Sequence, residues 1–133
     1  MPGGPTRGSF HVAYDDRDNI LRLEYRGHVT LELMLAAADA VFTTPGIGAG
    51  TRLLALHLDT SLDEIDLAAL RAYQAHKAAM GYPSLPTAAV IADIPGHLAM
   101  AALWAATKPG GRDGRARVFT EEASARAWLL AGR

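Results

Sequence analysis

The chain has 133 residues, with 13 Lys and Arg, 14 Asp and Glu, and no cysteine. This length is typical of one domain with a sizeable hydrophobic core, and the lack of cysteine excludes disulfide bonds, thiolate metal ligands and a cysteine nucleophile in this chain. A formal net charge of −1 argues against general binding of nucleic acid or anionic membranes, which needs an excess of Lys and Arg.

The first nine residues, 1–9, contain Gly, Pro and one Arg but no apolar run, so we predict a disordered lead-in rather than a signal or an anchor. A single domain is expected over residues 10–131. The longest apolar stretch, 88–107, is interrupted by charged, Pro and Gly residues and falls short of the roughly 18 apolar residues that a membrane span needs. We therefore expect a soluble, cytoplasmic protein without a membrane span.

Two strands are predicted at the start of the domain. Residues 10–14 form a short apolar run that a polar turn follows. Over residues 20–26 apolar and charged side chains then alternate, with Leu21, Leu23 and Tyr25 on the apolar face. A period of two is typical of a half-buried strand, so the pair is expected to form an antiparallel hairpin.

Helices and buried strands alternate along the rest of the chain. We predict a helix capped by Thr30, a buried strand over 53–58, a helix over 63–80, a strand over 87–92, a helix over 96–107, a strand over 115–119 and a final helix. Ser61 and Glu64 have the spacing of a capping box, which places the start of the second helix there. His76 and Met80 fall on the apolar stripe of that helix.

This order predicts an α/β fold. Strands separated by single helices usually pair in parallel, and the hairpin adds an antiparallel edge. The expected architecture is a mixed sheet of about five strands with about four helices.

Several stretches share their order and spacing with a known family. These are residues 20–30 leading into a helix, 53–59 ending in an acid, 88–92 before a helix, and 117–129. Together they resemble the STAS domain (sulfate transporter and anti-sigma-factor antagonist), in its small stand-alone SpoIIAA-like branch. The resemblance implies a non-enzymatic regulatory or binding module, in some members switched by phosphorylation of a Ser or Thr after the third strand. Thr60 and Ser61, which follow Asp59, occupy that place.

The segment Asp59, Thr60, Ser61 has two interpretations. It could be a phospho-switch or a ligand contact, because α/β folds tend to place ligands at the carboxyl ends of strands. It could also be a turn in which Thr60 or Ser61 caps the next helix. His57 and Asp59 could start a zinc site or an acid–base pair, but their spacing is a weak signal, and we expect His57 to lie on a sheet face or in the core. No catalytic residue, metal site or cofactor is predicted.

Four basic residues gather near the last predicted strand: Lys108, Arg112, Arg115 and Arg117. They could bind an anion or an acidic partner, or form a solvated loop.

The third predicted helix has no polar residue between Leu98 and Ala106. A surface helix normally carries a charged stripe, so this helix is expected to be buried on more than one side. A second copy of the chain, an apolar ligand or the rest of the domain could cover it. Met100, Leu103 and Trp104 are the candidate interface residues, since Met and Trp are enriched at interfaces.

The sequence therefore predicts a non-enzymatic STAS-like module that binds a regulatory protein, a second copy of itself or a small apolar ligand, and no nucleic acid. The alternative is a small α/β enzyme or small-molecule carrier with a pocket at the strand carboxyl ends near Asp59.

Overall fold

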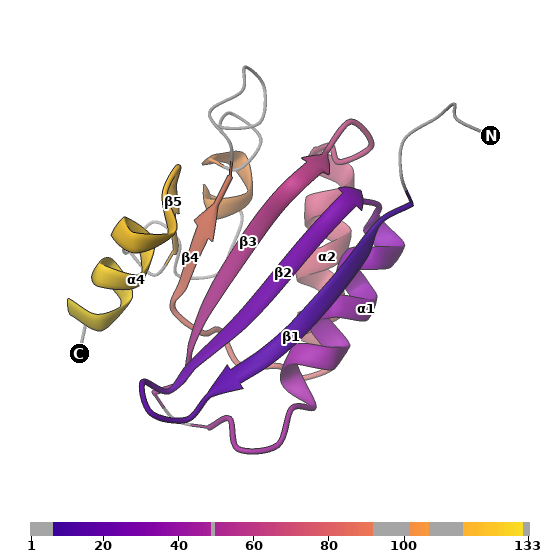
Figure 1. Ribbon diagram of the computed structural model, residues 1–133. Coiled ribbons are helices and arrows are strands. Elements are labelled where there is room, and N and C mark those ends of the chain that lie inside the picture. The colour runs from indigo at the N-terminus through magenta and orange to yellow at the C-terminus, as the bar shows by residue number, and fades with distance from the viewer. Residues whose placement is uncertain (1–6, 49, 92–101, 107–115, 132–133) are drawn as a thin grey trace.

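The computed structural model describes residues 7–48, 50–91, 102–106 and 116–131. They form an α/β domain around one five-stranded sheet (Figure 1). The strands are β1 (Ser9–Asp15), β2 (Ile20–His28), β3 (Arg52–Ser61), β4 (Thr87–Val90) and β5 (Ala116–Phe119). The helices are α1 (Leu31–Phe42), α2 (Leu67–Ala79) and α4 (Glu122–Ala131), and residues 102–106 are also helical.

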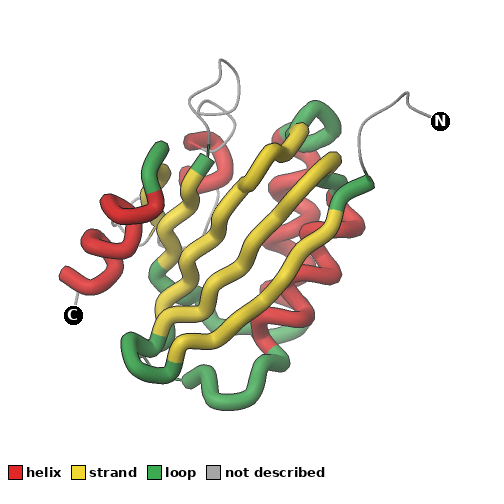
Figure 2. The backbone as a smooth tube through the Cα atoms, in the orientation of Figure 1, coloured by secondary structure: helices red, strands yellow, loops and turns green. Residues whose placement is uncertain are grey.

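The sheet has the mixed topology that the sequence predicts. Strand order follows chain order, β1-β2-β3-β4-β5. β1 and β2 pair antiparallel, and every later pair is parallel. Figure 2 shows the strands side by side, with helices on both faces of the sheet.

The described chain begins at Arg7, two residues before β1. Residues 1–6 of the predicted lead-in lie outside the described residues. Arg7 forms an isolated parallel bridge with His28. At Gly8 a Cβ atom would lie 2.0 Å from the carbonyl oxygen of His28, so only glycine permits this close approach of the two backbones.

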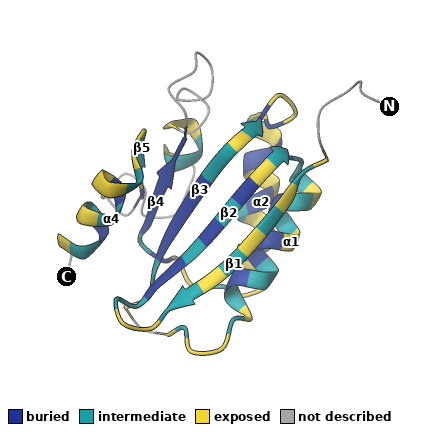
Figure 3. Ribbon diagram, in the orientation of Figure 1, coloured by how far each residue is buried: buried dark blue, intermediate teal, exposed yellow. Residues whose placement is uncertain are grey.

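The alternating pattern of β2 separates the two faces of the sheet. Leu21, Leu23 and Tyr25 are buried in a core beneath α1 and α2. A second core on the other face holds Leu54 and Leu56 of β3 against α4. β3 is therefore buried on both faces along its first half, as its apolar run predicts, and Figure 3 shows this burial at the centre of the sheet.

α1 begins where the sequence predicts. The Oγ1 of Thr30 accepts a hydrogen bond from the backbone N–H of Leu33 at 3.1 Å. Such a cap satisfies one of the free N–H groups of the first turn and contributes about 1 kcal/mol.

The predicted start of α2 is wrong by four residues. The helix begins at Leu67 rather than residue 63, and its N-cap is Asp66, whose carboxylate accepts from Ala69 N at 2.8 Å. Ser61 and Glu64 form no capping box, because β3 continues to Ser61 and both side chains contact His28 instead. Neither Thr60 nor Ser61 caps the helix, and Asp66 is the better N-cap acceptor at the residue where the helix starts.

α1 and α2 are joined by a polar cluster. The carboxylate of Asp39 lies 2.9 Å from Nε2 of His76 and accepts from the hydroxyl of Tyr82 at 2.7 Å, and the ring of Tyr82 stacks on Phe42. The Tyr82 hydroxyl, followed by His76, lowers the pKa of Asp39. His76 thus links α2 to α1 by a hydrogen bond to Asp39 and is not part of an apolar stripe. Met80 of the same predicted stripe is 53% exposed, because α2 ends at Ala79 beyond the edge of the core.

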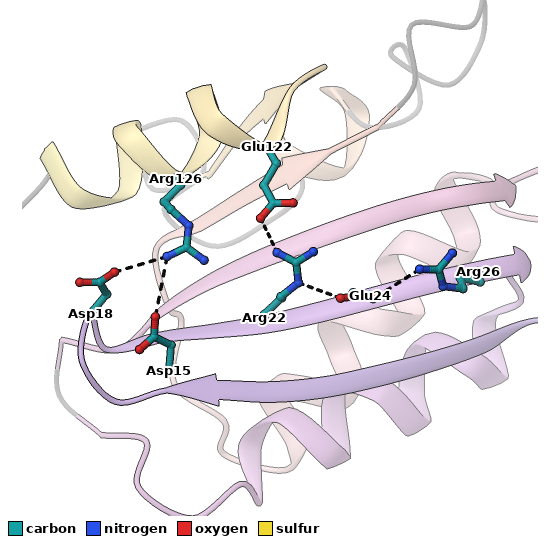
Figure 4. Close-up of polar contacts among 7 residues, drawn as sticks. All are labelled: Asp15, Asp18, Arg22, Glu24, Arg26, Glu122 and Arg126. Atoms are coloured by element: carbon teal, nitrogen blue, oxygen red, sulfur yellow. Dashed lines mark hydrogen bonds and ion pairs between the residues drawn. The ribbon is translucent and has the colours of Figure 1, made fainter.

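α4 is tied to the sheet by ion pairs as well as by packing. Arg22 of β2 contacts both Glu24 and Glu122, while Arg126 of α4 lies between Asp15 and Asp18 (Figure 4). Arg22 lowers the pKa of Glu24 by a direct hydrogen bond. These side chains are partly exposed, so each pair contributes at most about 1 kcal/mol.

Within the described part of the chain, no helix has both the length and the apolar character needed to cross a bilayer.

Candidate functional site

A β-bulge shapes the carboxyl end of β3. Leu58 pairs with Arg26 and Thr60 pairs with Gly27, so Asp59 is the extra residue. Its φ of 52° lies in the left-handed region, and Gly27 opposite has a φ of 76°. The bulge breaks the alternation of β3, so His57 and Asp59 are not equivalent positions on one face. Asp59 is exposed, whereas Thr60 and Ser61 are half-buried.

His28 connects the end of β2 to the turn between β3 and α2. Its Nδ1 lies 3.3 Å from Oγ of Ser61, and its Nε2 is hydrogen-bonded to the carboxylate of Glu64. A hydroxyl, an imidazole and a carboxylate are the components of a hydrolytic triad. Here, however, the side chain of Glu64 is 62% exposed. The contacts instead hold the turn 62–66 against the sheet.

An apolar cavity lies on the face of the sheet that α1 and α2 cover. Among the described residues its wall is formed by Leu23, Tyr25, Met34, Leu53, Ala55, His57, Leu62, Ile65, Leu70, Tyr73, Thr87, Ala89, Ile91 and Trp104. The cavity is partly open to solvent. The volume of the cavity is about 60 Å³. That is room for roughly four to six heavy atoms, at 10–15 Å³ for each water.

Small side chains on the sheet create this space. Ala55 of β3 and Ala89 of β4 are paired neighbours at the floor of the cavity. Leu70 and Tyr73 cover it from α2, and Trp104 lines it from the helical segment 102–106. Interiors are normally filled to the density of organic crystals, so a space of this size beneath a helix is a distinct feature of the fold.

Few side chains in the described wall carry a polar group, and most of those that do are aromatic. The ring of His57 stacks on Tyr25, with centroids 5.0 Å apart and an angle of 21°. Burial raises the pKa of Tyr25 well above its ordinary value and that of Tyr73 to about 12. The hydroxyl of Thr87 donates to the carbonyl of Leu85 at 2.8 Å. His57 therefore lies on a sheet face, as the sequence predicts.

The candidate switch residues and Arg117 do not line the cavity. Asp59, Thr60 and Ser61 are not among the described lining of the cavity, although the next residue, Leu62, is. Arg117 is exposed on β5, with its guanidinium 5.4 Å from the centre of the Phe119 ring. Lys108, Arg112 and Arg115 lie outside the described residues.

The predicted interface on the third helix is described only over residues 102–106. Met100 lies outside this range. Leu103 is 37% exposed, whereas Trp104 is half-buried against the main core and borders the cavity. The described part of this helix thus packs on the core through Trp104 and leaves Leu103 exposed.

Sequence analysis did not identify Tyr25 and Tyr73 as functional candidates. Both carried a signal, since Tyr25 is on the apolar face of a predicted strand and Tyr73 on the apolar stripe of a predicted helix. Periodicity shows which side chains turn inward but not where space remains between them.

The described residues contain no cluster of three or more His, Asp or Glu that could hold a metal ion. No protein-family model, no curated protein and no solved structure matches this chain.

Proposed function

We propose that this chain is a non-enzymatic binding module that holds a small apolar molecule in the apolar cavity. The cavity itself is the observation that carries the proposal. Its described lining contains no Lys, Arg, Asp or Glu, and most of it is Leu, Ile, Ala or aromatic. A concave, mainly apolar space with a few polar groups is the usual form of a small-molecule site.

The turn between β3 and α2 supports a regulatory role of the SpoIIAA-like kind. Leu62 and Ile65 of this turn border the cavity, while Ser61 and Glu64 contact His28 near the surface. A ligand that displaces Leu62 or Ile65 would also move Ser61 and Thr60. In this proposal a regulatory protein partner binds the turn with a different affinity when the ligand is present, because the ligand changes the position of the turn.

The alternative of an enzyme or carrier with its pocket near Asp59 has weaker support. The described cavity wall includes His57 and Leu62 on either side of that segment, but not Asp59 itself. Ser61 and His28 lie on the surface side of the turn, away from the concave space that a substrate would need.

Self-association is a second candidate function, favoured by Leu103. This large apolar side chain is 37% exposed on a short helical segment without a charged residue. Light scattering after size-exclusion chromatography tests it. A mass that rises with concentration in the wild type, but not in Leu103→Ser, supports a dimer, and a strict monomer rejects it.

The binding proposal is tested by titrating the protein with methylenecyclopentane while its methyl groups are followed by NMR. Met34, Leu70 and Ile91 line the cavity and are expected to show saturable shifts, whereas the exposed Met80 is not. The variant Ala89→Leu, which fills the cavity floor, should lose the shifts. Unchanged cavity methyls in the wild type, or equal shifts at Met80, would reject the proposal.

A further inference from the structure

Two buried phenol rings border the apolar cavity from opposite layers of the fold. Tyr25 comes from β2 and is 4% exposed, and Tyr73 comes from α2 and is 6% exposed. They are the only tyrosines among the described lining residues.

The hydroxyls of these two tyrosines differ from those of the other two in the chain. Tyr14 donates to Asn19 and Tyr82 donates to Asp39, each at 2.7 Å. No hydrogen bond joins the hydroxyl of Tyr25 or Tyr73 to any other residue of the described chain. Buried tyrosine hydroxyls normally have a partner. Neither hydroxyl is among the fully buried polar atoms that lack a partner in the described chain, so both hydroxyls are accessible to a molecule in the cavity that carries an acceptor.

The described part of the wall disfavours a charged partner. No Lys, Arg, Asp or Glu occurs among the described lining residues. A charged group in such surroundings would be desolvated without a salt-bridge partner, which is strongly unfavourable. Burial keeps both phenols in the neutral, donating form, since the pKa of each is raised.

We infer that the cavity takes an uncharged, mainly apolar molecule that carries a carbonyl or similar oxygen as hydrogen-bond acceptor for Tyr25 and Tyr73. The inference rests on the proposed binding function and names the class of its ligand. The size of the space limits the buried part of that ligand to roughly four to six heavy atoms.

Two ligands of the same shape separate this inference from the binding function itself. Cyclopentanone and methylenecyclopentane differ only in that one has a carbonyl oxygen where the other has a CH₂ group. Their affinities for the wild type, Tyr25→Phe, Tyr73→Phe and the double variant are measured by methyl NMR titration. Tyr82→Phe is the matched control, because its hydroxyl lies on Asp39 rather than in the cavity.

We expect each cavity variant to bind cyclopentanone about three- to tenfold more weakly, which is the effect of one neutral hydrogen bond. Methylenecyclopentane should bind the variants as well as the wild type or better, because a donor without a partner is removed. Tyr82→Phe should change neither affinity. A near-ultraviolet circular dichroism spectrum is recorded for each variant, and a spectrum similar to that of the wild type shows that the variant is folded.

The outcomes are distinct. If both compounds bind but the ratio of their affinities is the same in the wild type and the double variant, the ligand class is wrong and the binding function stands. If neither compound binds the wild type, the proposed function fails, and the inference fails with it.

Discussion

Ala88 and Ala89 are neighbours on β4 that face opposite layers of the fold. Ala88 is fully buried in the core beneath α4, whereas Ala89 is 3% exposed and borders the apolar cavity. The two positions have the same side chain and the same strand, but only one faces unfilled space.

This contrast predicts different responses to the same substitution. Ala88→Leu inserts three carbon atoms into a packed layer and should lower the free energy of unfolding by about 1–3 kcal/mol. Ala89→Leu places the same three carbon atoms in the cavity. The free energy of unfolding should then fall by less than about 1 kcal/mol, or rise. Urea denaturation of both variants measures the difference. Equal destabilisation would mean that no usable space exists above Ala89.

The start of α2 is tested at Asp66. Asp66→Ala removes the carboxylate that caps Ala69 N and should cost about 1 kcal/mol. Asp66→Asn should retain most of the stability, because Asn is also a good N-cap. Asp63→Ala changes an exposed acid in the turn and is the control, with an expected effect within about 0.5 kcal/mol. A larger loss at Asp63 than at Asp66 in urea denaturation would place the cap elsewhere.

The free energy of unfolding should fall at high pH, because the buried phenol of Tyr73 ionises less readily in the folded chain than in the unfolded chain. Burial raises its pKa to about 12, against an ordinary value of 10.0. Between these values the folded chain keeps the phenol proton and the unfolded chain loses it. The unfolded state then binds fewer protons, so the free energy of unfolding decreases as pH rises, by on the order of 2 kcal/mol from this group.

The measurement is urea denaturation at several pH values between 10 and 12, with Tyr73→Phe for comparison. The variant should show a shallower decline than the wild type. Phenolate absorbance that reports ionisation of Tyr73 near pH 10 in the folded protein would contradict its burial.

The ion pair between Arg22 and Glu122 predicts a small, salt-dependent contribution from α4. Glu122→Gln should lower the free energy of unfolding by about 0.5–1 kcal/mol at low ionic strength and by less at high salt, because the pair is partly exposed. Glu121→Gln alters the neighbouring exposed acid and serves as the control. Thermal unfolding of both variants at two salt concentrations checks the prediction. An equal effect of the two changes would show that the ion pair does not stabilise α4.

Periodicity was sufficient for most of the fold. The alternation around Leu23 and the helical spacing after Thr30 depend on local patterns, and the structure has both elements where they were predicted. The start of α2 was not predictable in this way. Ser61 and Glu64 have the right spacing for a cap, but pairing of Ser61 with His28 across two strands takes precedence over the local pattern.

The candidate site was less accessible to sequence analysis for a similar reason. The inward direction of Tyr25 and Tyr73 follows from their patterns, but the space between them depends on the alanines of two other strands. Such a space arises only when β2, β3, β4, α1, α2 and the helical segment 102–106 pack together. No motif in the chain encodes it.

Diffraction from crystals of the protein under xenon pressure tests the central claim most directly, because xenon enters apolar cavities of this kind without needing a polar partner. We predict xenon density in the apolar cavity, in contact with Leu70 and Ile91, and no density there in crystals of Ala89→Leu. A wild-type cavity that remains empty of xenon, or is filled by the side chain of Trp104, would contradict the account.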